Sequence, residues 1–557
     1  MFCTKSLGCL LVSVCVLCAV PASALDDEMH HHHEATEQLG KVSFPISCAP
    51  ASQKAFERGI ALLHSFGYEE AEEQFVEIAK NDPACAMAHW GIAMSLFHQI
   101  WERPQDSTLK RGHEEMEKAQ RTKIGAKTER EQGYISALAL FYRDSTSPDL
   151  AKNDPASNDY LKRAAAYSDA MAKLYQQYPT DSEAGAFYAL SLLAAASPDD
   201  TSLASEKKAV AVLNPLFQQQ PDHPGLAHYI IHSCDSPQLA PMGLDAARRY
   251  AGIASSSAHA VHMPSHIFAR LGLWQEDIQA NLKSVALTEQ SGAMYMHGHE
   301  LHAMHFLLYA YLQTGQDEAA RQIVEQSKEI LATAPANGDD SGMLEYYGYA
   351  AAHFPALYAL EMRHWTDAAA LQPAPNALPQ FQMITYLART IASAHVGDVE
   401  ATRSNAQKFD EAREATRKSK YAYLLDGPNT SQGEVRAWLA FAEKKNDDAL
   451  QQIRQVADTQ DKVGKAEVDL PAREMLADML LDLNQPEQAL LEYEKSMKID
   501  PNRFNGLAGA ARAAELAHQP VKANSYYAQL LKNCDEGKHS DRPELRSAKM
   551  VLAKNAQ

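Results

Sequence analysis

The sequence lacks several features that would place it in a common functional class. Its 557 residues contain no block of lysine and arginine, and the net charge is −19, which disfavours a nucleic-acid-binding surface. After the first 24 residues, no apolar run approaches the roughly 18 residues that cross a bilayer. Strand signals are almost absent. The sequence therefore predicts a helical protein with no transmembrane segment and no nucleic-acid partner.

Familiar catalytic and cofactor motifs are also missing. The chain has no Gly-x-Ser-x-Gly, no phosphate-binding loop, no dinucleotide fingerprint and no haem-attachment Cys-x-x-Cys-His. The segment HGHELHAMH (297–305) does not match the zinc-protease motif, because Ala303 lies four residues after His299 where a histidine is needed. No enzyme class follows from these motifs.

Cysteine is sparse, and half of it lies at the N-terminus. Residues 1–24 look like a secretory signal peptide: Lys5 supplies the positive charge, an apolar stretch runs from Leu7 to Val20, and Ala22-Ser23-Ala24 forms a cleavage site. We therefore expect a periplasmic or secreted protein, in a compartment that permits disulfides.

Four cysteines remain after this leader. Cys48 and Cys85 flank the first predicted helical hairpin and are a candidate pair, whereas Cys234 and Cys534 are expected to stay unpaired. Residues 25–50 form a tail that contains His30 to His33. Such a run either captures metal loosely or has no role.

Amphipathic helical runs with short breaks make up most of the chain. Ala489 and Ala523 are 34 residues apart, and the segments FGYEEAEEQFVEIAKNDP (66–83) and LNQPEQALLEYEKSMKIDP (483–501) both end in Asp-Pro. This pattern resembles the tetratricopeptide repeat, a 34-residue helix–turn–helix, in an exported protein of bacterial type. The resemblance implies an all-α fold, a right-handed superhelix of helical hairpins.

The repeat divides the chain into three regions. We expect an N-terminal arm over residues 51–223, a histidine-rich central region over 224–371 and a C-terminal arm over 380–557. The segment LQPAPNALPQ (371–380) is the expected joint, because its three prolines interrupt any helix.

Histidines recur on one face of the predicted central helices. In AHAVHMPSHIF (258–268), three histidines fall at i, i+3 and i+7, which is one stripe of a helix. In tetratricopeptide arrays the first helix of each pair lines a concave groove. In the register that the resemblance implies, eight histidines occupy groove positions: His228, His232, His259, His262, His266, His302, His305 and His353.

This arrangement is typical of metal ligands. Histidines one helical turn apart direct two imidazoles at one ion, and neighbouring helices supply further ligands. An all-imidazole site suits copper, zinc, nickel or iron and disfavours magnesium and calcium. Nearby methionines favour copper, whereas a carboxylate from Asp235 or Glu300 would suit iron.

The leading hypothesis is an exported protein that binds copper, zinc or iron through the histidines of its groove. A metal-dependent enzyme that activates water or dioxygen remains an alternative, because eight histidines exceed the needs of one structural site. A metal-free scaffold that binds a protein or peptide partner in the groove is the third hypothesis.

Overall fold

A computed structural model describes residues 37–100, 103–122, 126–143, 158–292, 296–333, 343–428, 430–464 and 469–555. The predicted signal peptide and the run from His30 to His33 lie outside these residues. From Gln38 onward the chain forms one compact unit. The described residues contain helices and no strand, so the predicted all-α class is confirmed.

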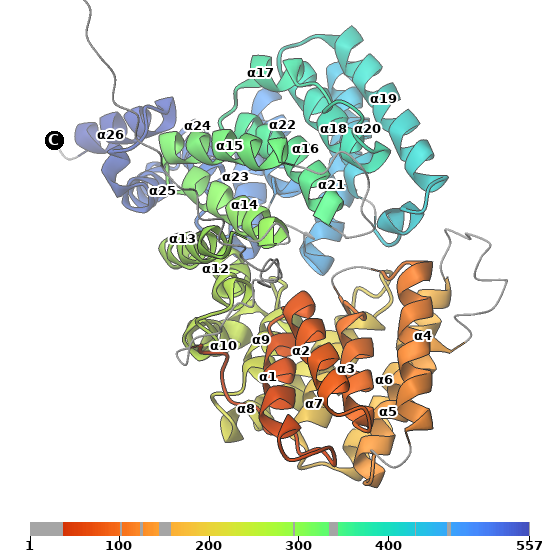
Figure 1. Cartoon of the computed structure of the whole chain (residues 1–557). Helices are drawn as coiled ribbons and strands as arrows, with labels where there is room; N and C mark the ends of the chain where they lie inside the picture. Colours follow the sequence, from red (N-terminus) through yellow and green to blue (C-terminus); the bar gives the residue numbers. More distant parts are fainter. Residues whose placement is uncertain are drawn as a thin grey trace, which may run out of the picture. The chain divides into compact units, whose positions relative to one another are not determined.

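The helices follow one another with short connections (Figure 1). The first ten are α1 (Ser52–His64), α2 (Tyr68–Asn81), α3 (Ala86–Ser95), α4 (Asp106–Arg121), α5 (Glu129–Tyr142), α6 (Asn158–Gln177), α7 (Ser182–Ala194), α8 (Ala204–Gln219), α9 (Pro224–Ser233) and α10 (Ala240–Ile253). The central ones are α11 (Ala258–His262), α12 (Pro264–Leu271), α13 (Trp274–Ser291), α14 (His297–Gln313), α15 (Asp317–Ala332), α16 (Met343–Glu361) and α17 (Trp365–Ala370). The last are α18 (Pro379–His395), α19 (Val399–Arg417), α20 (Thr430–Ala442), α21 (Asn446–Val463), α22 (Ala472–Asp482), α23 (Pro486–Ile499), α24 (Phe504–Leu516), α25 (Pro520–Asn533) and α26 (Pro543–Asn555), with short 3₁₀ turns at Ala422–Leu425 and Asp535–Gly537.

One turn recurs between paired helices along the described chain. The residue two positions before the second helix has a positive φ, and the next backbone N–H bonds to the carbonyl five residues earlier, as from Leu273 to Phe268 (2.8 Å). This is the bonding pattern of a Schellman turn. The positive-φ positions are Phe66, Gly272, Gly315, Arg363, Gly397, Lys444, Asn484 and His518. Their recurrence confirms that the fold is built from repeated helical hairpins.

Two contacts join helices that are far apart in sequence. Besides the packing of consecutive helices, α1 packs against α9 and α14 packs against α24. At the second contact, the buried guanidinium of Arg503, which directly precedes α24, donates to the Tyr309 hydroxyl of α14. It also donates to Glu361 on α16 (2.7 Å) and to Glu474 on α22 (2.7 Å). These contacts bury helix faces that an open array would leave exposed.

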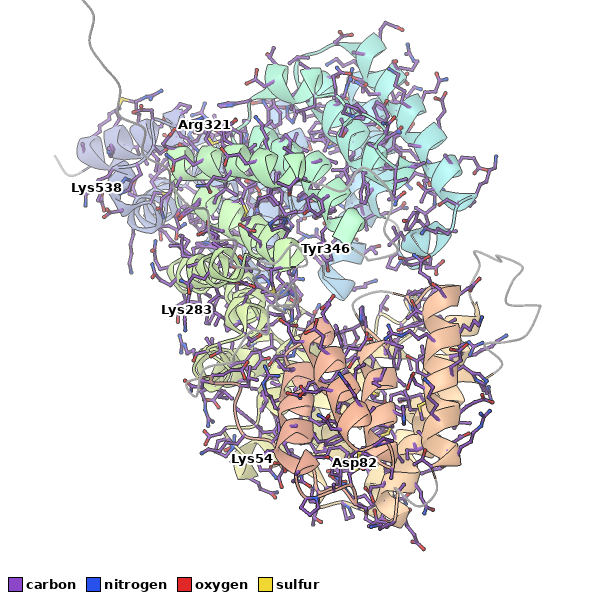
Figure 2. All side chains as sticks on the ribbon, in the orientation of Figure 1. Lys54, Asp82, Lys283, Arg321, Tyr346 and Lys538 are labelled. Atoms are coloured by element: carbon purple, nitrogen blue, oxygen red, sulfur yellow. A yellow bond between two sulfur atoms is a disulfide. The ribbon has the colours of Figure 1, made fainter. Side chains whose placement is uncertain are left out.

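The buried apolar side chains form three large clusters along the chain. One spans Leu39 to Phe268, the next Ala269 to Leu357, and the last Ala356 to Ala548. Charged side chains such as Lys54 and Arg321 lie on exposed surfaces (Figure 2). Among the described residues, no helix has the length and apolar character needed to cross a membrane.

Candidate metal centre

Six of the eight predicted histidines meet in two groups of three. Within each group, one nitrogen of every imidazole lies within 4.8 Å of the corresponding nitrogens of the other two. The first histidine group is His228, His232 and His259, and the second histidine group is His262, His266 and His302. The second group takes its members from α11, α12 and α14, which pack against one another, and in the first group His228 on α9 meets His259 on α11 at 3.1 Å. A metal site needs such convergence from separate helices.

The segment 258–268 serves both groups. α11 and α12 are separate helices because Pro264 has no N–H to continue the hydrogen-bond ladder. Met263, between them, keeps helical dihedral angles (φ −50°, ψ −36°). The stripe of three histidines predicted from sequence is therefore preserved, but it is divided: His259 belongs to the first group, and His262 and His266 belong to the second.

In the second group, hydrogen bonds at Nδ1 fix the tautomers of His262, on α11, and His266, on α12. His262 Nδ1 lies 2.6 Å from Asn281 Oδ1, and His266 Nδ1 lies 2.8 Å from Asp235 Oδ2. The Asn281 amide is oriented by its own nitrogen, which donates to the Asp277 carbonyl (3.0 Å) and carboxyl (2.8 Å). Both imidazoles therefore carry their proton on Nδ1 and present a lone pair at Nε2, as metal-binding histidines do.

Those two lone pairs face each other. His262 Nε2 and His266 Nε2 are 3.1 Å apart. With each imidazole neutral and its proton held at Nδ1, neither Nε2 has a hydrogen to share, so a cation between the two nitrogens would stabilise the pair. Two nitrogens bound to one tetrahedral zinc ion would lie about 3.4 Å apart. The observed separation is therefore close to that of two ligands of one ion.

The first group contains a second close pair of Nε2 atoms, in which a hydrogen bond fixes the tautomer of His228. His228 Nδ1 lies 2.6 Å from the backbone carbonyl of His64, so its lone pair is at Nε2, 3.1 Å from His259 Nε2. His232 Nε2 is buried and has no hydrogen-bond partner among the described residues. A buried polar atom without a partner is costly unless a ligand satisfies it.

Proton binding is weak at five of these six imidazoles. Burial, followed by the neighbouring imidazoles, lowers the pKa of four of these histidines well below the usual range: His228, His259, His262 and His302. Burial also lowers the pKa of His232 to about 3. These five imidazoles are thus neutral at neutral pH, which is the form that binds metal.

Asp235 supports the second group from outside it. Although burial opposes ionisation, Arg270 and His266 lower the pKa of Asp235 well below its usual range. Its second oxygen accepts from Arg270 Nε at 2.9 Å. Among the described residues, neither Asp235 nor Glu300 belongs to a three-ligand group with the histidines, so the carboxylate expected for an iron site is not placed as a ligand.

Several predicted positions differ in the structure. His305 and His353 form a separate pair, with ring centroids 4.6 Å apart, outside both groups. His297 and His299 are the first and third residues of α14. The predicted open groove is also wrong for these residues: His228 and His262 are 0% and 1% exposed. The α1–α9 contact brings His64 and Phe66 against His228, and sequence spacing gives no sign of it.

Sequence reasoning missed a third buried cluster. Glu183 accepts from His64 Nε2 (2.7 Å) and from His223 Nε2 (2.9 Å), and His64 Nδ1 bonds to the Tyr229 hydroxyl (2.9 Å). His223 Nδ1 accepts the Leu226 N–H. All four imidazole nitrogens therefore have partners, which is typical of a structural network and not of a metal site.

The cysteines behave as expected from their positions. Cys48 and Cys85 form a disulfide, and Cys234 and Cys534 are buried free thiols. Asp82 lies near the disulfide, but sulfurs bonded to each other do not act as thiolate ligands.

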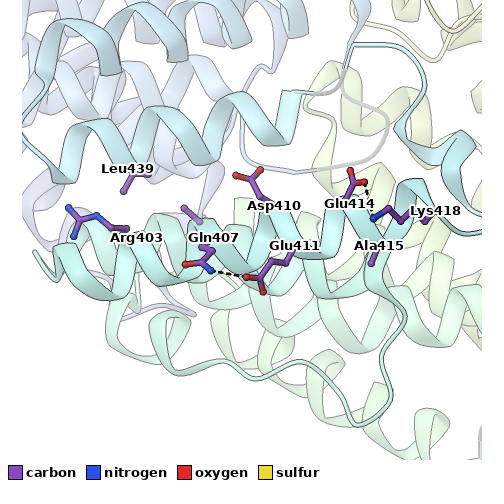
Figure 3. A pocket seen from close by; sticks show the side chains of 9 residues that line it. Arg403, Gln407, Asp410, Glu411, Glu414, Ala415, Lys418 and Leu439 are labelled. Atoms are coloured by element: carbon purple, nitrogen blue, oxygen red, sulfur yellow. Dashed lines mark hydrogen bonds and ion pairs between the residues drawn. The ribbon is translucent and has the colours of Figure 1, made fainter.

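A surface recess on α19 does not gather potential metal ligands from several helices, as the histidine groups do. It is lined by exposed polar residues that pair along the helix, including Gln407 with Glu411 and Lys418 with Glu414 (Figure 3). Such pairs are typical of a solvated helix face. The histidine groups are the stronger candidate.

Comparison with known proteins adds little about function. No protein-family description and no curated protein matches the chain. Among solved structures, a human IFIT1 dimer with m7Gppp-AAAA is 11% identical, covers 80% of this chain and 90% of its own, and has a TM-score of 0.35. A monomeric IFIT1 mutant with Gppp-AAAA is 10% identical, covers 92% and 98%, and has a TM-score of 0.33. At these values the likeness supports no conclusion about ligand or partner.

Proposed function

We propose that this chain is an exported protein of the tetratricopeptide type that binds a transition metal through its two histidine groups. The facing Nε2 lone pairs of His262 and His266, 3.1 Å apart, carry the proposal. Their Nδ1 partners, Asn281 and Asp235, orient the rings in the way that outer partners orient metal-bound histidines. Copper, zinc and iron all suit imidazole ligands.

Export is part of this proposal. It is supported by the signal-like residues 1–24 and by the disulfide between Cys48 and Cys85, which persists in oxidising compartments. A protein in such a compartment would store a metal ion or deliver it to another protein.

A metal-dependent enzyme is the second candidate. Each group has three protein ligands, which is the number found in catalytic zinc sites that keep a fourth position for water. A scaffold that binds a protein or peptide partner without metal is the third, and it predicts that no metal is present.

Elemental analysis of the untagged protein, purified without chelator, tests the proposal. A parallel sample lacks His30 to His33, so that loose capture by the tail is not counted. We expect copper, zinc or iron in both samples at one equivalent or more. If neither sample contains metal or takes it up on titration, the metal-free scaffold is correct.

A further inference from the structure

The two histidine groups lie side by side, and one short helix carries members of both. α11 supplies His259 to the first group and His262 to the second, and the centroids of these two rings are 6.2 Å apart. His232 on α9 and His266 on α12 join the groups at a second point, with the same centroid distance of 6.2 Å. Within the first group, the centroids of His232 and His259 are 6.3 Å apart. The gap between the groups is therefore no wider than the spacing within one of them.

α14 adds a third point of contact between the groups. It carries His302 of the second group, and His299 lies one turn before it on the same helix. The ring centroid of His299 is 5.3 Å from that of His259 in the first group. The imidazoles of α9, α11, α12 and α14 thus form one continuous cluster.

The ring spacing limits how far apart two bound ions can lie. An ion at the usual metal–nitrogen distance of about 2 Å is about 3.2 Å from the centroid of the imidazole that binds it. One ion bound by His232 and another bound by His266, whose centroids are 6.2 Å apart, are therefore separated by no more than about 13 Å.

The cluster lies in apolar surroundings. The ring centroid of Phe66 is 4.4 Å from that of His228 in the first group, and the centroid of Phe306 is 4.5 Å from that of His266 in the second. Both phenylalanine side chains are buried. Solvent and salt therefore screen charges in the cluster less than they do at the protein surface.

Two ions at this separation repel each other. For two divalent ions about 13 Å apart, Coulomb's law makes the second binding step about tenfold weaker, even with the dielectric constant of water. With the effective dielectric constant of about 20 that suits protein sites, the factor is on the order of several thousand. A shorter separation increases both factors.

We propose that the two histidine groups form one two-ion centre, in which repulsion between the ions makes the second ion much easier to release than the first. The inference rests on the proposed function and extends it to the way in which metal leaves the protein. It favours delivery over storage, since the second ion is the one that the protein gives up to an acceptor.

A thermodynamic cycle with Zn²⁺ tests the coupling between the groups. The chain without His30 to His33 is titrated against a chelator of known affinity, beside two variants that each keep one group: His228→Ala with His232→Ala, and His262→Ala with His266→Ala. For independent groups, the product of the two stepwise association constants of the wild type equals the product of the constants of the two variants. We expect the wild-type product to be smaller by at least about tenfold.

The opposite results of the cycle are equally definite. An equal or larger wild-type product overturns the inference and leaves the proposed function intact. A variant that is folded by circular dichroism but binds no zinc in its remaining group also overturns it, because the centre then holds one ion.

Cu²⁺ tests the proximity of the two ions without any substitution. We expect the electron paramagnetic resonance spectrum of the wild type to show dipolar broadening at two equivalents that is absent at one, because ions within about 13 Å couple magnetically. Two bound equivalents without coupling overturn the inference. If the wild type binds neither Zn²⁺ nor Cu²⁺, the proposed function itself fails, since Cu²⁺ binds such sites more tightly than Fe²⁺ does.

Discussion

The tautomer of His262 depends on one amide, and its replacement gives the sharpest prediction. Asn281 Oδ1 accepts from His262 Nδ1 at 2.6 Å, and both side chains are buried. Asn281→Leu removes this acceptor. In the metal-free variant the proton moves to Nε2 and is shared with His266 Nε2, 3.1 Å away. Metal binding must then displace that proton and leave a buried Nδ1–H without its acceptor.

The expected decrease in metal affinity follows from the His262 Nδ1–H that is left without an acceptor. Leaving a buried donor unsatisfied costs about 1–3 kcal/mol, which corresponds to a decrease in metal affinity of about 5- to 150-fold at 1.4 kcal/mol per tenfold. The second histidine group alone should show the loss. Ser265 Oγ lies 3.4 Å from His262 Nδ1 and can accept in part, so the loss should be larger when Ser265→Ala is added.

Competition with a chromophoric chelator measures the affinity, and thermal melting shows whether the variant is folded. The matched control is Asn281→Asp, which keeps an acceptor for the His262 Nδ1–H. Burial raises the pKa of the neighbouring Asp277 carboxyl well above its usual range. This control should bind metal as the wild type does. A folded Asn281→Leu variant with wild-type affinity at both sites would refute the account of the tautomers.

Three further predictions concern stability. Burial lowers the pKa of His395 to about 4 from 6.5, so between these two pH values the unfolded chain binds a proton that the folded chain does not. The free energy of unfolding therefore decreases by about 3 kcal/mol as the pH falls from 7 to 4. His395→Phe should remove this part of the decrease, measured by urea titrations at pH 7 and pH 4. Arg503→Met leaves two buried carboxylates unpaired and should destabilise the fold by about 3–5 kcal/mol in the same assay. Cys48→Ser opens a disulfide with a sequence separation of 37 residues, and the chain-entropy relation gives a loss of about 4 kcal/mol, measured by urea titration against the oxidised wild type.

Each of these predictions has its own control. For the pH effect, identical curves for wild type and His395→Phe would show that this histidine is not responsible. For the arginine, Glu361→Gln with Glu474→Gln should recover part of the stability lost in Arg503→Met, and no recovery would contradict the electrostatic cause. For the disulfide, the reduced wild type should match Cys48→Ser, and a difference between them would assign the loss to the serine itself.

The helices and their turns could be predicted because their signals are local. Gly272 and Gly315 mark turns that need a positive φ, and the 34-residue spacing of Ala489 and Ala523 reflects a repeated hairpin. The same turn also recurs with residues that give no such signal, such as Lys444, where packing of the two helices overrides the local preference.

The histidines could be predicted as a set, but their grouping could not. Spacing alone places His259 with its neighbours His262 and His266, whereas the structure joins it to His228 and His232 on α9. The packing of α11 on its neighbours decides this, and it depends on contacts far apart in sequence.

The metal content of individual sites is the most direct test of the central claim. The measurement is elemental analysis of wild type, loaded with copper, zinc or iron, beside three variants: His228→Ala with His232→Ala, His262→Ala with His266→Ala, and all four changes together. A surface variant, His364→Ala with His539→Ala, controls for the loss of histidine. The account predicts two equivalents in wild type and in the surface control, one in each paired variant and none in the fourfold variant. The same metal content in the wild type and the fourfold variant would contradict it.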